Sequence, residues 1–468
     1  MDLNRKALKS GFWFVLANLI VRAMSLITTP IFSRLLTKAE YGEFSNISSW
    51  LHIAIIVVTM RMEASFISAK FDYKDRLDQY NLSVLGLTGI STAFWILLVN
   101  VLPGLFTGWL DMRLLYINLI LVYCFFHAVV NVFQMNERYA YRYKQSVFVA
   151  LFLAVSSTLL SILLVRHMQN RLSGRVLGSV IMTIAVGAVL LFRFVIKGRK
   201  IDAAIWPYVL KVCIPYVPHL LSLQILNSMD RIMIRKIWGA EDTAMYTIAY
   251  SCGHMVTLLM TSMNGAFAPW LGDKLMEGAH KEIRKISSYY ILLFSVMAIG
   301  MMLLAPEVLL IMGGKKYLDA RYVMPPVAMG CICQFLYTLY VNIEQYKKKT
   351  VGMAFASIGA AVLNYVLNLI FIPKYGYIAA AYTTLAGYLF LLVVHMLLVR
   401  KLRYADVYDS RFILMLVGVI GLITVGVNLL YSTPILRYIT VAVYAAVMGT
   451  ALWIKRDMVK MLLRKIRH

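Results

Sequence analysis

The sequence predicts an all-α, polytopic membrane protein with about 14 transmembrane helices. Apolar runs of about 20 residues recur along the whole chain of 468 residues, and a helix of that length crosses the hydrocarbon core of a bilayer. Hydrophobic residues make up 61% of the chain and charged residues 15%, whereas soluble domains carry roughly 25% charged residues. These observations exclude a soluble globular domain.

Short polar loops separate the apolar runs and define the predicted spans. They cover approximately residues 11–33, 44–67, 82–103, 113–135, 147–166, 176–196, 212–230, 242–265, 288–312, 322–344, 351–373, 378–399, 411–431 and 435–454. Their even number places both termini on one side of the membrane. In the longest predicted loop, 266–287, Pro269 and Trp270 stand among mixed charges, which favours a short amphipathic helix in the membrane interface.

The positive charges predict the orientation. Of the 47 Lys and Arg, 30 lie in loops and tails on the side of the N-terminus, 14 on the opposite side and three within spans. Because cytoplasmic loops are enriched in Lys and Arg, both termini are expected in the cytoplasm. Orientation thus accounts for the net charge of +25, and we expect no nucleic-acid partner. The basic tail after Trp453 is interpreted as a membrane anchor or as a site for anionic lipid.

A weak internal repeat indicates two similar halves. The segment RLLTKAE, from Arg34 to Glu40, precedes span 2, and RKIWGAE, from Arg235 to Glu241, precedes span 8. The offset of 201 residues corresponds to six spans, which predicts two halves of equal orientation. We therefore expect a six-helix N-lobe in residues 1–200 and a six-helix C-lobe in 201–405. Residues 406–468 would hold two further helices and the tail.

Two arginines within the first spans are candidate substrate ligands. Arg22 lies at the middle of span 1, where an arginine is costly unless it faces protein or water. It is interpreted as a cation that faces a wet lumen and binds an anionic substrate, or as a structural arginine paired with helix carbonyls or an acid. Arg61, near the end of span 2, either joins it or reaches the lipid headgroups. Glu63 is two residues on, a spacing at which helical side chains do not face each other.

Span 7 carries two prolines, Pro215 and Pro218, and an unusual number of polar groups. Such groups should face other protein or a wet cavity, because hydrocarbon leaves them unsatisfied. The candidate substrate-binding residues here and at the end of span 10 are His219, Asn227, Asp230, Arg231 and Asn342. The alternatives are structural: a local cap or interlobe ion pair for Asp230 and Arg231, and a hydrogen-bonded histidine for His219.

Polar pairs at i, i+4 are expected to share one helix face. His127 and Asn131 form such a pair in span 4, and Asn364 and Asn368 form another in span 11. The asparagines are interpreted as residues that join helices by hydrogen bonds.

Motifs for catalysis, nucleotides and metals are absent from the sequence. The five cysteines lie within apolar spans without metal-like spacing, and GGKKY at 313–317 lacks the leading glycine and Ser/Thr of a phosphate loop. Every predicted external loop is too short for a catalytic domain. We expect no enzyme activity, no cofactor and no metal.

Three stretches resemble a known family. They are the opening from Gly11, which runs into TPIFSRLLTKAEYGEFS, then SMDRIMIRKIWGAEDTAMYTIAYS at 228–251, and GAAVLNYVLNLIFIPKYGYIAAAYTTLAGYLF at 359–390. In order and spacing the chain is similar to Wzx-type polysaccharide and O-antigen flippases. These belong to the polysaccharide transporter family of the multidrug/oligosaccharidyl-lipid/polysaccharide (MOP) exporter superfamily.

The resemblance implies two six-helix lobes around a cavity that opens alternately to each side of a bacterial cytoplasmic membrane. It implies an undecaprenyl-diphosphate-linked oligosaccharide, such as an O-antigen, capsule or exopolysaccharide unit, moved to the periplasmic leaflet. It also implies membrane lipids, a polysaccharide polymerase and a chain-length regulator as partners. Flippases of the MurJ type line the cavity with arginines from spans 1, 2 and 8. Span 8 here has no arginine, which argues against lipid II as the substrate.

Two other functions stay open at this point. A multidrug or cation antiporter of the same superfamily would need acids within the N-lobe spans, where Glu63 is the candidate. A membrane polysaccharide polymerase or glycosyltransferase would usually carry a large external loop with catalytic acids.

Overall fold

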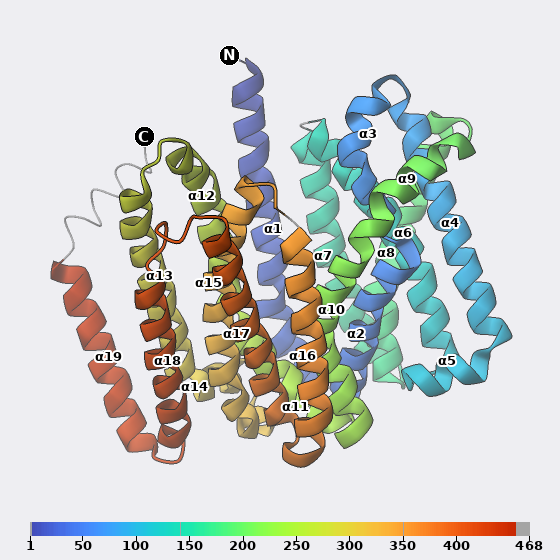
Figure 1. Cartoon of the computed structure of the whole chain (residues 1–468). Coiled ribbons are helices and arrows are strands. Elements are labelled where there is room, and N and C mark those ends of the chain that lie inside the picture. Colours follow the sequence, from blue (N-terminus) through green and yellow to red (C-terminus); the bar gives the residue numbers. More distant parts are fainter. Residues whose placement is uncertain (1, 141, 350, 455–468) are drawn as a thin grey trace. The chain divides into compact units, whose positions relative to one another are not determined.

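The computed structural model describes residues 2–140, 142–349 and 351–454, without the side chains of 2–12, 14–16, 18, 22 and 451–454. Every regular element in this part of the chain is a helix, which confirms the predicted all-α class (Figure 1). The basic tail after Trp453 lies outside the described residues, apart from the end of the last helix.

The chain divides into two compact units. The first unit comprises Met1–Ile248, Met312–Gly314 and Lys349–Gly387. Its helices are α1 (Asp2–Leu35), α2 (Lys38–Thr59), η1 (Met62–Ser65), α3 (Phe66–Asp72), η2 (Lys74–Arg76), α4 (Leu77–Val101), α5 (Pro103–Leu110), α6 (Leu114–Tyr139), α7 (Tyr143–His167), α8 (Arg171–Gly198), η3 (Ala203–Ile205), α9 (Trp206–Cys213), η4 (Ile214–Tyr216), α10 (Val217–Trp238) and α16 (Val351–Tyr375).

The second unit comprises Ala249–Ile311, Lys315–Lys348 and Tyr388–His468. Its helices are α12 (Thr257–Met276), α13 (His280–Leu303), α14 (Ala305–Met312), η5 (Lys315–Val323), α15 (Met324–Tyr346), α18 (Ser410–Leu430) and α19 (Pro434–Ile454). Helices α11 (Ala240–His254) and α17 (Tyr377–Lys401) have one part in each unit, and the last residue of α14, Met312, belongs to the first unit. The predicted lobe boundaries at residues 200 and 405 remain predictions.

Ten helical segments of the described residues are long and apolar enough to cross a membrane. The number is eleven if the bent pair Lys38–Thr59 and Met62–Asp72 forms one span. The chain is therefore a multi-pass membrane protein. Three predicted spans fall outside this set: 11–33 on α1, 242–265 on α11 and α12, and 435–454 on α19. The count of about 14 remains a prediction.

The second predicted span is broken. Its two parts meet at an angle of 53°, and Met60 and Arg61 at the break have φ angles of 46° and 49°. These left-handed values interrupt a right-handed helix. The break contains no glycine or proline from which it could be predicted. By contrast, the prolines of span 7 produce a 3₁₀ turn, η4, within the continuous segment Ala203–Trp238.

The expectation of a long loop at 266–287 is wrong. Helix α12 continues through Pro269 to Met276, and α13 begins at His280. Only Glu277, Gly278 and Ala279 connect the two helices, and Gly278 supplies the turn with a φ of 68°. The amphipathic pattern of this region therefore belongs to the ends of two packed helices.

Packing inside the first unit places α10 beside N-terminal helices. Helix α10 packs against both α2 and α16. Its residues Leu226, Ile232 and Ile234 are buried. Gly387 of α17 also lies close to α10, because a Cβ added there would be 3.1 Å from Leu226. In the second unit α15 is the most deeply buried candidate span and packs against α12, α13 and α18.

Candidate functional site

The break in the second span brings Arg61 and Glu63 together. Arg61 Nε lies 3.1 Å from Glu63 Oε1, and the side chains are 38% and 3% exposed. The expectation that the two cannot face each other is wrong, because it assumed a continuous helix. The left-handed conformation at Met60 and Arg61 turns the backbone, so residues 61 and 63 no longer follow helical spacing.

Helix α6 completes this polar group. Asn131 Nδ2 donates a 3.4 Å hydrogen bond to Glu63 Oε1 and lies 3.2 Å from His127 Nδ1. The predicted shared face of His127 and Asn131 is thus confirmed. The other carboxylate oxygen of Glu63, Oε2, is buried and has no hydrogen-bond partner within the described part of the chain.

A cavity of about 230 Å³ opens beside these residues within the first unit. Arg61, Glu63, Asn131 and Arg138 supply its charged and strongly polar walls, and Ala17, Val147 and Ala150 supply apolar ones. We call it the Arg61 cavity. It combines two guanidinium groups with one buried carboxylate inside a membrane protein, so it can attract an anion and orient it.

Asp230 occupies a different place, in the middle of α10, and is 2% exposed. Its Oδ2 accepts hydrogen bonds from Tyr246 (2.6 Å) and Thr384 (2.5 Å), and its Oδ1 accepts one from Asn368 Nδ2 (2.6 Å). Asn364 Nδ2 in turn donates to Thr384 Oγ1 at 3.3 Å. The predicted role of the two asparagines as a link between helices is therefore confirmed, with Asp230 at the centre of the network.

The neighbouring candidates on α10 have local partners. Arg231 donates a 2.7 Å hydrogen bond to the carbonyl oxygen of Asn227, one helical turn earlier, and its guanidinium lies 6.0 Å from the ring centroid of Tyr246. His219 stacks at an angle on Tyr216, with the ring centroids 5.8 Å apart.

The remaining candidates lie elsewhere. Asn342 belongs to the second unit, where its Nδ2 donates to Asn264 Oδ1 at 2.8 Å and so joins α15 to α12. Glu344, close by on α15, is 1% exposed and lies 2.8 Å from His395 Nδ1. The backbone of Arg22 is part of α1, but its side chain lies outside the described residues. Substrate contact by any of these candidates remains a prediction.

A second charged group in the first unit escaped the sequence analysis. Arg235, at the end of α10, lies 2.5 Å from Glu43 of α2 and 3.1 Å from Asp111 after α5. Next to Glu43, Gly42 contacts the start of α11 so closely that an added Cβ would lie 1.7 Å from the Ala240 carbonyl oxygen. Arg235 and Ala240 belong to the second repeated segment, and Gly42 and Glu43 follow directly after the first. Only the tertiary structure brings these residues together. They clamp α2, α10 and α11 together at one end of the unit.

Comparison with known proteins identifies the family. The profile of the polysaccharide biosynthesis protein family matches residues 7–275, more than half of the chain, and the MatE profile matches residues 215–370. An uncharacterized membrane protein of Methanocaldococcus jannaschii is 23% identical, over 91% of this chain and 90% of its own length.

Two solved structures show the same fold. The lipid II flippase MurJ in its inward closed conformation superimposes with a TM-score of 0.67 at 14% identity, over 96% of this chain and all of that one. An inward-facing multidrug resistance transporter of the MATE family superimposes with a TM-score of 0.65 at 13% identity, over 82% of this chain and 95% of that one. The chain therefore belongs to the polysaccharide biosynthesis protein family, within the MOP exporter superfamily of membrane transporters and flippases.

Proposed function

We propose that this protein is a flippase for a lipid-linked oligosaccharide with a diphosphate bridge, of the O-antigen, capsule or exopolysaccharide class. It would act in the cytoplasmic membrane of a bacterium, with both termini in the cytoplasm, and move its substrate to the periplasmic leaflet. The transport step requires no bond chemistry. Membrane lipids, a polysaccharide polymerase and a chain-length regulator are the proposed partners.

The observation that carries this proposal is the Arg61 cavity. A guanidinium within a membrane span is retained only where it faces protein, water or an anion. Arg61 remains 38% exposed despite its contact with Glu63, so its donors are accessible to a ligand. Guanidinium groups bind phosphate oxygens through paired, charge-assisted hydrogen bonds. The diphosphate is the part of a lipid-linked glycan that needs such a partner inside the membrane.

The clamp at Arg235 and Gly42 supports alternating access. With the predicted orientation, the start of α2 and the end of α10 lie at the periplasmic side, so this contact closes that side. Partly exposed ion pairs contribute little stability each, which makes the closure reversible. The substrate would enter from the cytoplasmic side in this conformation and leave after the clamp separates.

The test is substitution of Arg61 in cells that depend on this protein for a surface glycan. Loss of a charge-assisted hydrogen bond costs about 1.5–3 kcal/mol, so Arg61→Ala should lower the transport rate about 10- to 100-fold. Arg61→Lys keeps the charge and should retain more activity. The matched control is Arg166→Ala, since Arg166 is an exposed arginine at the end of α7. Normal surface glycan with correctly inserted Arg61→Ala protein would refute the role of the cavity.

Cation antiport is the second candidate, and the free Oε2 of Glu63 favours it. A buried carboxylate oxygen without a donor can take up a proton or a cation. The MatE profile match adds support. Accumulation of cationic dyes discriminates between the candidates: an antiporter lowers accumulation in wild-type cells and loses this effect with Glu63→Gln, whereas a glycan flippase leaves accumulation unchanged in both.

A further inference from the structure

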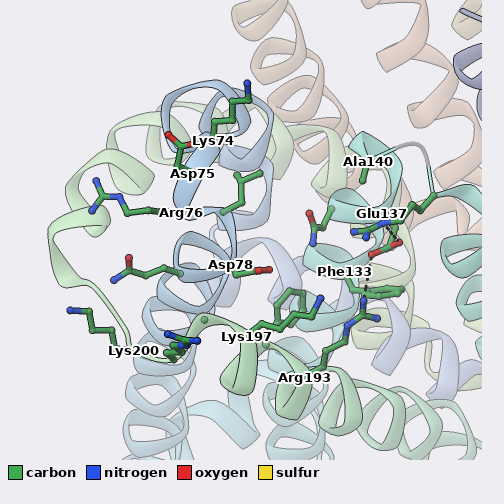
Figure 2. A pocket seen from close by; sticks show the side chains of 17 residues that line it. Lys74, Asp75, Arg76, Asp78, Phe133, Glu137, Ala140, Arg193, Lys197 and Lys200 are labelled. Carbon is green, nitrogen blue, oxygen red and sulfur yellow. Dashed lines mark ion pairs between the residues drawn. The ribbon is translucent and has the colours of Figure 1, made fainter. Parts of the chain in front are cut away.

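A second polar cavity of the first unit has no part in the proposed transport path. It measures about 730 Å³ and lies between residues 74–79, the end of α6 and residues 193–200 (Figure 2). We call it the basic cavity. It shares no lining residue with the Arg61 cavity, although both adjoin α6.

Cations outnumber acids on its walls. Seven cations line it, namely Lys74, Arg76, Arg142, Arg193, Lys197, Arg199 and Lys200, against the three acids Asp75, Asp78 and Glu137. Glu137 is already engaged, because its carboxylate lies 3.0 Å from Arg142 Nε and 4.0 Å from Arg193 Nη2. Dashed lines mark these ion pairs in Figure 2. The excess of four positive charges in one concave site repels itself unless an anion enters.

The backbone holds these cations in place. Gly198 packs so closely on α4 that an added Cβ would lie 2.6 Å from Leu82 Cβ and 2.8 Å from the Asp78 carbonyl oxygen. The next residue, Arg199, has a positive φ of 60°, which is unusual for a residue with a side chain. The end of α8 is thereby fixed against α4, and Lys197 and Arg199 line one cavity wall.

The cavity lies beside an exposed apolar surface. On α8, Phe192 and Ile196 are one turn apart and are 68% and 60% exposed. Arg193 and Lys197, each one residue further on, occupy the adjacent face and line the cavity. At the end of a membrane helix, an apolar face would contact the acyl chains of the lipids, and a cationic cavity beside it would lie at the level of their phosphate groups.

We propose that the basic cavity binds a phosphate-bearing anion, and we expect the headgroup of an anionic phospholipid as its source. The cavity holds several lysines and arginines, which suit a phosphate with its several oxygens better than a single carboxylate. A bound headgroup would bridge α4, α6 and α8. This inference is independent of the transported substrate, so it stands or falls separately from the flippase function.

Native mass spectrometry of the full chain, purified in detergent, tests the proposal. The protein is titrated with phosphatidylglycerol, with phosphatidylcholine and with soluble pyrophosphate. The cavity variant combines Arg76→Gln, Lys197→Gln and Lys200→Gln, because none of these side chains forms an ion pair among the described residues. We expect wild-type protein to bind phosphatidylglycerol more tightly than phosphatidylcholine. The variant should bind it about 100-fold more weakly, as the loss of three cations near a membrane surface implies.

Two further variants keep the test decisive. The matched control removes three lysines from the loop after α15 (Lys347→Gln, Lys348→Gln, Lys349→Gln), on the same predicted side of the membrane, and should bind like wild type. Asp75→Asn, which adds one net positive charge to the cavity, should bind several-fold more tightly even if the triple variant misfolds. Tight pyrophosphate binding that the cavity variant loses, without lipid binding, would support the site and assign it a soluble ligand. Equal lipid affinity for wild type, cavity variant and Asp75→Asn would overturn the proposal.

Discussion

Replacing Asp230 with leucine should destabilise the first unit strongly. Leucine has the same branched shape but no acceptor, so the buried donors around Asp230 lose their partner. Tyr246 and Thr384 both donate to Oδ2, and Asn368 donates to Oδ1. The four residues come from α10, α11, α16 and α17, and their hydrogen bonds therefore join four helices.

The magnitude follows from counting the donors that lose their acceptor. Asn368 Nδ2 also donates to Asn364 Oδ1 at 3.2 Å, so it keeps a partner after the change. The hydroxyl groups of Tyr246 and Thr384 lose the acceptor they share. A buried donor that loses its acceptor costs about 1–3 kcal/mol, which gives about 2–6 kcal/mol for Asp230→Leu. Asp230→Asn keeps one oxygen for the two hydroxyls and should cost about 1–3 kcal/mol, because it places an amide nitrogen opposite Asn368.

Thermal unfolding of the detergent-purified protein measures these differences. Size-exclusion chromatography after heating gives the fraction that remains folded, and the order of stability should be wild type, then Asp230→Asn, then Asp230→Leu. At about 2–4 °C per kcal/mol, the leucine variant should unfold at least about 4 °C below wild type. A leucine variant as stable as wild type, or more stable than the asparagine variant, would show that these hydrogen bonds do not hold the four helices together.

The clamp gives two more predictions. Arg235→Glu should place three acids together and weaken the closure of the periplasmic side, which lowers the transport rate. The double variant Arg235→Glu with Glu43→Arg swaps the two charges and should restore part of that rate. Equal transport rates for the single and the double variant would contradict the role of this ion pair. Gly42→Ala should cost about 1–3 kcal/mol of stability in thermal unfolding, because its Cβ would lie 1.7 Å from the Ala240 carbonyl oxygen. Gly104→Ala, with nothing within 4 Å of the added Cβ, is the control, and equal unfolding temperatures for the two variants would argue against the close contact.

Much of the fold was predictable because its signals are local. Hydropathy over about 20 residues identifies membrane helices one at a time, and eleven of the predicted spans correspond to candidate membrane segments of the structure, if the bent pair is one span. Helical periodicity likewise placed His127 with Asn131 and Asn364 with Asn368, since residues four apart share a face of any helix.

The predictions that failed depended on where helices break. The pattern at 266–287 was amphipathic, but the helix on either side continued through it and left a three-residue turn. The left-handed residues Met60 and Arg61 have no sequence signal, and the contact between Arg61 and Glu63 exists only because of them. Backbone geometry of this kind is set by the helices packed around the break, which a local pattern does not contain.

By itself, the sequence determined the class of the protein and the faces of its helices, because burial in lipid and helical spacing act over short stretches of chain. Only the tertiary structure decided which polar groups meet. Asp230 and Asn368 are 138 residues apart, and Arg235 and Glu43 are 192 apart. Their pairing depends on which helices pack side by side, and the cost of leaving a buried polar group unpaired then selects these partners.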